Sequence, residues 1–423
     1  MLQLNYIREN KEETIARLAI KNFDAKEIIE KILSFDNDRR KTQTELDALN
    51  AEANTLAKQI GELFKSAKQA EASDLKNKSA AVKESAKKLE ILLASTEEEL
   101  NKVLVLLPNT PSKLVPKGKT PADNEVMQTE GEVPVLYAHA KPHWELAQQY
   151  DIIDFELGVK LTGAGFPVYK GKGAKIQRAL INFFLDQATA AGYYEIEPPI
   201  LVNEASGFGT GQLPDKEAQM YHVTLDNLYL IPTAEVPITN IYRDTILKSE
   251  ELPIKNCGYT PCFRREAGSY GKDVRGLNRL HQFDKVEIVQ ITHPDKSYDV
   301  LEEMRNYVAG LLKQLGLPFR ILKLCGGDMG FGSALTYDFE TYSAAQQKWL
   351  EVSSVSNFET FQSNRSKIRF RETNGKPQLA HTLNGSALAL PRIVATLLEN
   401  NQTEKGIVIP KILVPYTGFE MIS

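Results

Sequence analysis

Two long heptad patterns in the first quarter of the chain restrict this region to paired helices. Between Ile28 and Phe64 apolar residues recur at spacings of three and four, interrupted only by Arg39 and Thr42, and a second series runs from Leu75 to Val103. Each series covers about four to five heptads, which is typical of a coiled coil. The polar segment between them is short and contains no proline, so we expect an antiparallel coiled coil over about 26–103. At 1.5 Å per residue this arm would be on the order of 55 Å long.

Such an arm buries only its own seam, so its expected role is reach and contact. The second helix carries a group of lysines that only Glu84 opposes between positions 76 and 88. These are Lys76, Lys78, Lys83, Lys87 and Lys88. A strip of this kind can follow the phosphates of a nucleic acid, and it can equally be a solvated helix face. The residues alone leave both interpretations open.

Beyond residue 107 the heptads end. We expect a helical arm at 1–107, a linker rich in proline and lysine at 108–125, and a second domain at 126–423. In this last part an amphipathic pattern from Gly173 to Gly192 predicts a helix. The segments YYEIEPPILV, NLYLIPTAEVP, HQFDKVEIVQI, FRILKL and LTYDFETY read as strands. The pattern predicts an α+β fold around a largely antiparallel sheet flanked by helices.

Composition excludes several classes of protein. The net charge of −4 argues against a protein that binds nucleic acid with its whole surface, although a local basic strip remains compatible with it. Three cysteines are too few for a disulfide framework and fit a reducing compartment. The N-terminus shows no signal-peptide pattern, and no long apolar run occurs. The sequence therefore predicts a soluble, cytoplasmic protein with no membrane association.

Chemistry-bearing residues gather in FRREAGSYGKDVRGLNRLHQFDKVE, residues 263–287. If the start of this segment is a strand, Arg264 and Glu266 share one face, and the guanidinium could bind a phosphate bidentately. A basic loop with Arg275 and Arg279 follows, and a returning strand places Phe283 and Glu287 on one face. Phe283 could stack on a purine ring, and the Glu287 carboxylate could bind an ammonium group. No signature of a covalent nucleophile, zinc protease or Walker phosphate loop occurs in the sequence.

Two further places suit a nucleotide. Glu351 and Ser354 stand three residues apart in WLEVSSVSNFETFQ and could supply oxygen ligands to Mg²⁺. Arg392 lies near the start of a predicted helix after HTLNGS, where free amide groups and a guanidinium suit a polyphosphate.

Together these segments resemble the seryl-tRNA synthetase family of class II aminoacyl-tRNA synthetases. The segment 263–287 is similar to motif 2 of that class, and YYEIEPPIL to motif 1, its dimerisation element. TAEVP, EVSS, NFETFQSNR and LNGSALALPR resemble further signatures of the seryl family, and the N-terminal heptads resemble its arm. The match covers essentially the whole chain. It implies a homodimer that joins L-serine to ATP, giving seryl-adenylate and pyrophosphate, and then transfers serine to the 3′ end of tRNA(Ser), with tRNA(Sec) as an open second acceptor.

The resemblance also implies residue roles. Arg264 and Arg392 would be catalytic, since Arg264 would bind the α-phosphate and the serine carboxylate, and Arg392 would bind the γ-phosphate. Glu266 and Phe283 would hold adenine. Glu351 and Ser354 would bind Mg²⁺. The ATP site as a whole would comprise Arg264, Arg265, Glu266, Phe283, Glu351, Val352, Ser353, Ser354 and Arg392. The serine site would comprise Thr233, Ala234, Glu235, Arg264, Glu287, Asn384 and Ser386. The tRNA would meet the five arm lysines together with Arg275 and Arg279.

Two departures and two alternatives accompany this interpretation. Arg265 stands where the family commonly has serine, and Val355 where it commonly has cysteine. The alternatives are a related ligase that loads an amino acid onto a carrier protein, and a non-catalytic paralogue that only binds tRNA. Carrier-protein ligases lack the long arm, and a paralogue would be expected to lose residues such as Arg264 or Glu351. Only 31 residues follow Arg392, too few for a C-terminal anticodon-reading domain, so tRNA recognition is expected from the arm.

Overall fold

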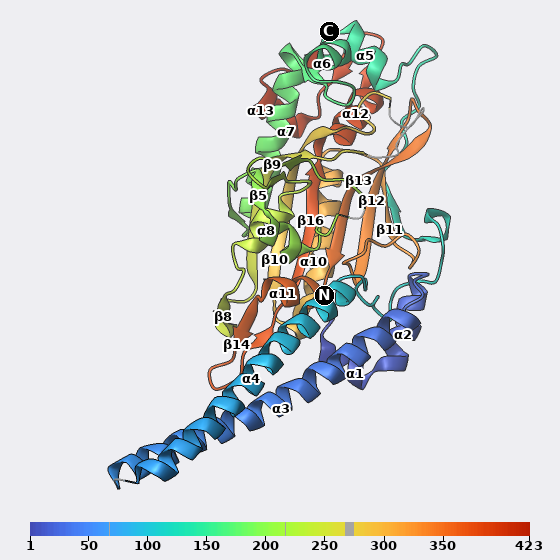
Figure 1. The fold of residues 1–423 in the computed structure, drawn as a ribbon. Helices are drawn as coiled ribbons and strands as arrows, with labels where there is room; N and C mark the ends of the chain where they lie inside the picture. The colour runs from blue at the N-terminus through green and yellow to red at the C-terminus, as the bar shows by residue number, and fades with distance from the viewer. Residues whose placement is uncertain (67, 216, 267–274) are drawn as a thin grey trace. The chain divides into compact units, whose positions relative to one another are not determined.

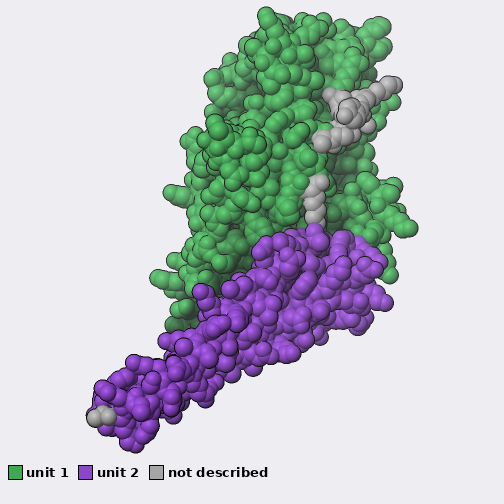
Figure 2. Space-filling view, in the orientation of Figure 1, with its two compact units in different colours: residues 1, 20–22, 109–423 green, residues 2–19, 23–108 purple. Residues whose placement is uncertain are grey.

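The computed structural model describes residues 1–66, 68–215, 217–266 and 275–423. The chain divides into two compact units (Figure 2). The arm unit comprises Leu2–Ala19 and Phe23–Pro108, and the sheet unit comprises Met1, Ile20–Asn22 and Asn109–Ser423. Among the described residues, no helix combines the length and apolar composition needed to cross a bilayer.

The arm unit is built on the two long helices that the heptads predict. After the short helices α1 (Leu4–Glu9) and α2 (Lys11–Ile20), helices α3 (Lys26–Lys65) and α4 (Gln69–Leu104) pair along their length (Figure 1). The buried seam of α3 includes Ile29, Ile32, Leu46 and Leu56, and that of α4 includes Ala72, Val82, Ala86 and Leu100. The predicted coiled coil is therefore confirmed.

One polar residue of this seam explains why Arg39 interrupts the heptads. Asp36 is 2% exposed and accepts hydrogen bonds from Arg39 and from Arg8 of α1, each at 2.9 Å. Burial alone would raise the pKa of Asp36, but the two guanidinium groups hold it below its usual value. Arg39 thus stabilises a buried carboxylate next to the seam.

The sheet unit is organised around eight strands in the order β1-β11-β12-β13-β16-β10-β9-β4. All neighbours in this sheet pair antiparallel except β4 and β9. The strands are β1 (Glu125–Glu130), β11 (Phe319–Lys323), β12 (Leu335–Ser343), β13 (Lys348–Asn357), β16 (His381–Ala389), β10 (Gln282–Thr292), β9 (Ile254–Phe263) and β4 (Tyr194–Glu195). This confirms the predicted α+β fold with a largely antiparallel sheet.

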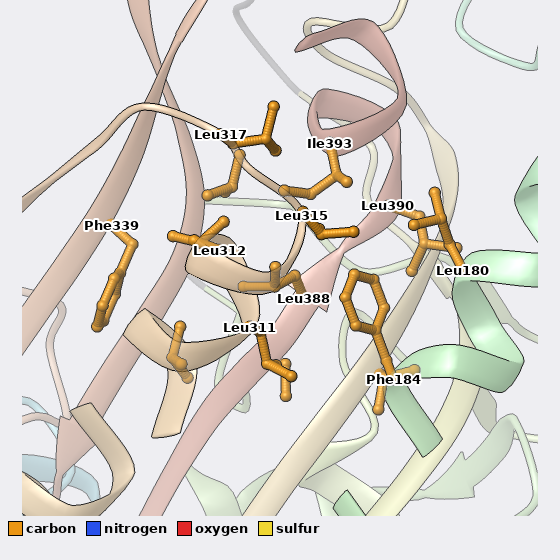
Figure 3. Packing of buried hydrophobic residues seen from close by; sticks show 14 of the residues in the cluster. Leu180, Phe184, Leu311, Leu312, Leu315, Leu317, Phe339, Leu388, Leu390 and Ile393 are labelled. Atoms are coloured by element: carbon orange, nitrogen blue, oxygen red, sulfur yellow. The ribbon is translucent and has the colours of Figure 1, made fainter. Parts of the chain in front are cut away.

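Three helices bury the apolar face of the sheet: α7 (Gly171–Ala190), α10 (Ser297–Gln314) and α12 (Leu390–Asn400). Phe184, Leu311 and Ile393 from these helices lie in one cluster with Phe339 and Leu388 from the strands (Figure 3). In β10 the core residues Val286 and Ile288 alternate with Lys285 and Glu287, so these charged side chains lie on the opposite face.

Two of the expected strands are shorter than predicted. In YYEIEPPILV, β4 stops at Glu195 and β5 (Leu201–Asn203) begins after two prolines, which cannot donate to a ladder. In NLYLIPTAEVP only β7 (Leu228–Leu230) is a strand, and helix α9 (Glu235–Asn240) begins after a turn at 231–234. Residues of the expected linker also have fixed partners, since the amides of Asn109 and Ser112 donate to the carbonyls of Phe331 and Ala334.

Candidate active site

Arg264 and Phe283 meet at the end of the hairpin formed by β9 and β10. The backbone amide of Arg264 donates to the carbonyl of His281 at 2.9 Å, which extends the ladder one residue beyond β9. The Arg264 guanidinium lies 5.2 Å from the centre of the Phe283 ring, and its Nε donates to the carbonyl of Pro232 at 3.4 Å. The site thus presents an aromatic face on which adenine could stack, next to a cation that could bind a phosphate group.

The strand predicted for Arg264 to Glu266 is wrong. β9 ends at Phe263, and Glu266 has a left-handed backbone with φ of +49°. Glu266 instead turns toward Arg279 and accepts a hydrogen bond from it at 2.9 Å. Arg265 is exposed, and its backbone amide donates to the carbonyl of Gln219. Residues 267–274, which belong to the predicted basic loop before Arg275, lie outside the described residues.

A cluster of buried polar side chains, called the polar pocket below, joins three segments that are far apart in sequence. Glu287 of β10 lies opposite Ser386 of β16, and Asn384 lies two residues along the same strand. From the turn before α9, the Thr233 hydroxyl donates to Glu287 Oε2 at 3.2 Å, and the amide of Glu235 donates to the Thr233 hydroxyl. Five predicted serine-site side chains therefore come together: Thr233, Glu235, Glu287, Asn384 and Ser386. Ala234 instead packs with Ile238 and Val289 in a small hydrophobic cluster beneath the pocket.

Two carboxylates facing this pocket make it electronegative. Burial, followed by the nearby Glu287 carboxylate, raises the pKa of Glu235 to about 7. Gln362 donates to Glu235 Oε1 at 2.6 Å, and Lys285 forms a buried ion pair with Glu287. The amide nitrogen of Asn384 is buried and has no hydrogen-bond partner of ordinary geometry among the described residues, although it lies near enough to Glu235 to lower the pKa of that group. An unmatched donor and an excess of carboxylate suit a small ligand that carries both an ammonium and a polar oxygen.

Gln362 and Lys285 are site residues that sequence reasoning missed. Gln362 lies in NFETFQSNR, which resembles the family as a whole but marks no single residue as functional, and its Oε1 accepts from Thr382 at 2.7 Å. Lys285 was visible as an alternation partner of Glu287, but only the structure shows that it is buried against it.

A β-bulge brings the proposed metal ligands to one face. Residues three apart on a regular strand point to opposite faces. In β13, however, Glu351 pairs with Glu340 and Ser354 with Asp338, so one extra residue is inserted at Val352. Since Asp338 and Glu340 share a face of β12, Glu351 and Ser354 share it too. Val352 lies in the hydrophobic core, and Ser353 pairs with the core residue Phe339, so neither side chain lies on the face that carries Glu351 and Ser354. The Ser353 hydroxyl donates to the Ser386 carbonyl at 2.6 Å.

Asp338 adds a carboxylate to this face that the sequence reasoning did not single out. The Ser354 hydroxyl donates to Asp338, and burial together with the Glu351 carboxylate raises the pKa of Asp338 well above its ordinary value. No group of three His, Cys, Asp or Glu side chains able to hold a metal alone occurs in the described part of the chain. An all-oxygen set of this size fits Mg²⁺, which usually takes one or two carboxylates and completes its shell with phosphate and water.

Arg392 lies beside Glu351 at the start of α12. Its Nη1 donates to the Glu351 carbonyl at 2.7 Å, its Nε donates to the Asn278 carbonyl at 2.9 Å, and the Glu351 carboxylate is 3.6 Å away. The guanidinium is thus placed next to the proposed metal ligands. It lies on the same side of the sheet as Arg264 and Phe283.

Comparison with known proteins points to one family along the whole chain. Residues 1–111 match the seryl-tRNA synthetase N-terminal domain, and residues 221–401 match the tRNA synthetase class II core domain (G, H, P, S and T). A serine–tRNA ligase of Salinibacter ruber is 49% identical over 425 residues, spanning 100% of this chain and 99% of that protein. One from Geobacter sulfurreducens is 47% identical, spanning 99% of both. The chain belongs to the seryl-tRNA synthetase family.

Solved structures agree with this assignment. A seryl-tRNA synthetase from Pyrococcus horikoshii, complexed with ATP, superimposes with a TM-score of 0.92 at 32% identity, over 100% of this chain and 99% of that one. A cytoplasmic serine–tRNA ligase from Naegleria fowleri, in complex with AMP, gives 0.87 at 25% identity, over the same shares of both chains. The predicted activity, ATP-dependent ligation of serine to tRNA, is confirmed, and neither the carrier-protein ligase nor the non-catalytic paralogue is supported.

The electrostatics of the pocket predict a pH dependence of serine binding. With a pKa of about 7, Glu235 is mostly protonated at pH 6 and mostly ionised at pH 8. Since an ionised carboxylate attracts the serine ammonium, the KM for serine should fall by up to about tenfold over this range. Serine-dependent ATP–pyrophosphate exchange measures it, and Glu235→Gln is the matched control. Titration of serine itself is common to both proteins, so an equal pH dependence in the two would contradict the role of Glu235.

Proposed function

We propose that the buried polar pocket binds L-serine and that Arg264 joins it to the ATP site. The observation that carries this assignment is the position of one cation between two sites. Arg264 lies over Phe283 on one side and is bonded to Pro232, which precedes the pocket residue Thr233, on the other. A guanidinium there can contact both the serine carboxylate and the α-phosphate, which must approach one another in the first step.

In that step a carboxylate oxygen of serine attacks the α-phosphorus, the bond to the bridging oxygen of pyrophosphate breaks, and seryl-adenylate forms. The 3′-terminal ribose hydroxyl of tRNA then attacks the seryl carbonyl and AMP leaves. Both catalytic residues, Arg264 and Arg392, contribute positive charge beside the phosphates rather than a covalent bond. Catalysis would rest on positioning and charge neutralisation.

The remaining ATP contacts follow from the geometry around Phe283. Adenine would stack on Phe283 with Glu266 near its amino group, and Arg392 would bind the γ-phosphate. Glu351 and Ser354 would hold Mg²⁺, which supplies charge neutralisation on the triphosphate when bound. Arg265 is exposed and takes no contact in this assignment, and Val352 and Ser353 contribute backbone only.

The tRNA is proposed to contact the arm, chiefly through Lys83 and Lys87. All five lysines of the predicted strip are exposed. However, Lys78 pairs with Glu52 of α3 at 3.0 Å, Lys88 pairs with Glu84 at 2.8 Å, and Lys76 lies 4.5 Å from the centre of the Phe64 ring. Lys83 and Lys87, one helical turn apart, are therefore the favoured phosphate contacts. Arg275 and Arg279 are the proposed contacts in the sheet unit, although Arg275 lies on the Trp144 ring and Arg279 pairs with Glu266, so tRNA would have to compete with these contacts. The proposed acceptor is tRNA(Ser), and tRNA(Sec) and the cytoplasmic location stay predictions.

A second copy of the chain is proposed to cover the edge of the sheet at β4. Edge strands expose unpaired backbone groups that favour pairing or covering. Tyr194 on this strand is 74% exposed, and a cavity of about 540 Å³ beside it is lined by α7 and β4. The homodimer expected from the family would cover this face.

The amino-acid selectivity of exchange tests the serine pocket. A pocket that hydrogen-bonds the serine hydroxyl leaves buried polar groups unpaired with alanine, so alanine should support exchange on the order of 10⁴-fold less well. Threonine must be excluded by size, which discriminates less. Equal exchange with serine and alanine would refute the pocket assignment.

In the same assay Glu351→Gln should raise the Mg²⁺ concentration needed for half-maximal exchange, and an unchanged requirement would remove Glu351 from the metal site.

Charge reversal in the arm separates tRNA binding from activation. The double variant Lys83→Glu, Lys87→Glu should lower kcat/KM for tRNA in the charging reaction by about tenfold or more at low salt, because two phosphate contacts become repulsive. Exchange without tRNA should not change. Lys102→Glu is the matched control, since Lys102 is exposed on the same helix but lies outside the strip. A parallel loss of charging and exchange would contradict the assignment.

The mass of the protein in solution tests the proposed homodimer. Sedimentation equilibrium at micromolar concentration should give twice the 47.3 kDa of one chain. Tyr194→Arg should shift the equilibrium toward single chains, because it places a charge in the proposed interface. A single-chain mass for the unaltered protein would overturn the dimer.

A further inference from the structure

His143 is a fully buried histidine behind the ATP site that none of the assigned roles uses. It begins helix α5 (His143–Gln149) and is 0% exposed. Its backbone amide and its Nδ1 both lie within hydrogen-bond distance of Glu399 Oε1, at 2.9 and 2.7 Å. Glu399, on α12, is also 0% exposed, and it accepts further hydrogen bonds from Gln346 and Ser343. Burial alone would raise the pKa of Glu399, but these donors hold it below its usual value, so the carboxylate is ionised.

The other ring nitrogen of His143 holds the backbone that precedes β10. The amide of Leu277 donates to His143 Nε2 at 2.8 Å. A backbone amide can only donate, so Nε2 is the acceptor, and the ring proton is on Nδ1, where it donates to Glu399. The ring is thus fixed in one tautomer by a carboxylate on one side and a peptide on the other.

The residues before Leu277 fit closely against the same helix start. Gly276 has φ of +66°, and a Cβ atom there would lie 2.2 Å from His143 Nε2, so glycine is required for both reasons. The Arg275 guanidinium lies 4.8 Å from the centre of the Trp144 ring. His143 and Trp144 therefore anchor the residues at 275–277.

This anchor connects directly to Arg392. The carbonyl of Asn278, the residue after Leu277, accepts from Arg392 Nε at 2.9 Å. The Asn278 side chain donates to Gln346 Oε1 at 2.9 Å, and Gln346 in turn donates to Glu399 at 2.8 Å. Two chains of hydrogen bonds thus run from Glu399 to this backbone, one through His143 to Leu277 and one through Gln346 to Asn278.

We propose that His143 and Glu399 are positioning residues for ATP activation: they fix the backbone at 277–278, whose carbonyl aims the Arg392 guanidinium at the terminal phosphates. This inference rests on the proposed role of Arg392. The carbonyl of Asn278 is one of only two backbone acceptors of Arg392 found among the described residues, so a small displacement of it would rotate the guanidinium. A misplacement of this kind weakens phosphate binding without altering the serine pocket, which lies on other residues.

Two substitutions at His143 separate this role from stability. In His143→Asn the amide can still reach Glu399 but offers no acceptor to Leu277, whereas the longer His143→Gln can offer its Oε1 at the position of Nε2. We expect His143→Asn to raise the KM for ATP about tenfold, with the KM for serine unchanged, and His143→Gln to restore it to within about threefold. Steady-state exchange gives both constants.

The control is His381→Asn, because His381 is partly buried and bonded to Ser297 at 2.8 Å, and no contact between it and Arg392 occurs among the described residues. It should lower the melting temperature and leave the KM for ATP unchanged. Should His143→Asn fail to fold, Gln346→Ala removes the second connection at a partly exposed position and should raise the KM for ATP a few-fold.

Arg392→Ala distinguishes the proposed function of Arg392 from the positioning role of His143 and Glu399. If it leaves ATP use unchanged, the proposed function of Arg392 fails. If it raises the KM for ATP while His143→Asn and Gln346→Ala do not, or if the KM values for ATP and serine rise together in the His143 variants, only the positioning role is overturned. In support of it, the double variant of His143→Asn and Arg392→Ala should bind ATP no more weakly than Arg392→Ala alone.

Discussion

The alternation of side chains along β10 is the constraint on which the sheet unit depends. Val286 and Ile288 pack into the core under the helices, and this fixes the register that turns Phe283, Lys285 and Glu287 to the other face. A slip of one residue would exchange the two sets. It would place two buried charges in the core and leave two apolar side chains in the pocket. The same packing that stabilises the fold therefore sets the chemistry of the site.

Neighbouring strands complete the site by pairing with β10 or by departing from regular pairing. The register of β16 sets Ser386 opposite Glu287, so the pocket gains a hydroxyl beside its carboxylate. Farther along the sheet, the bulge at Val352 lets Glu351 and Ser354 share a face. The bulge also keeps Val352 in the core. If β13 were a regular strand, only one of Glu351 and Ser354 would place its side-chain oxygen on this face.

Sequence patterns predicted the elements with strong periodicity and the residues that resemble family motifs. The coiled coil, α7 and β10 follow from spacing alone, since the buried and exposed positions repeat. The bulge at Val352 has no such signal, because an inserted residue in a strand reads as ordinary alternation with one mismatch. The pairing of Glu266 with Arg279 was also out of reach. It depends on a left-handed turn at Glu266, whereas the pattern suggested a strand.

The way in which Arg264 and Arg392, the two proposed catalytic arginines, are held would leave them available to phosphate. The Nε atoms of Arg264 and Arg392 both donate to backbone carbonyls, those of Pro232 and Asn278. Neutral acceptors fix the orientation of a guanidinium but do not cancel its charge, whereas a carboxylate at close range would do both. Arg279 shows the contrast, since its 2.9 Å pair with Glu266 neutralises it. The Glu351 carboxylate approaches Arg392 only at 3.6 Å, a longer pair that offsets less of the guanidinium charge. Positive charge that is oriented before ATP arrives is what electrostatic catalysis of adenylate formation requires.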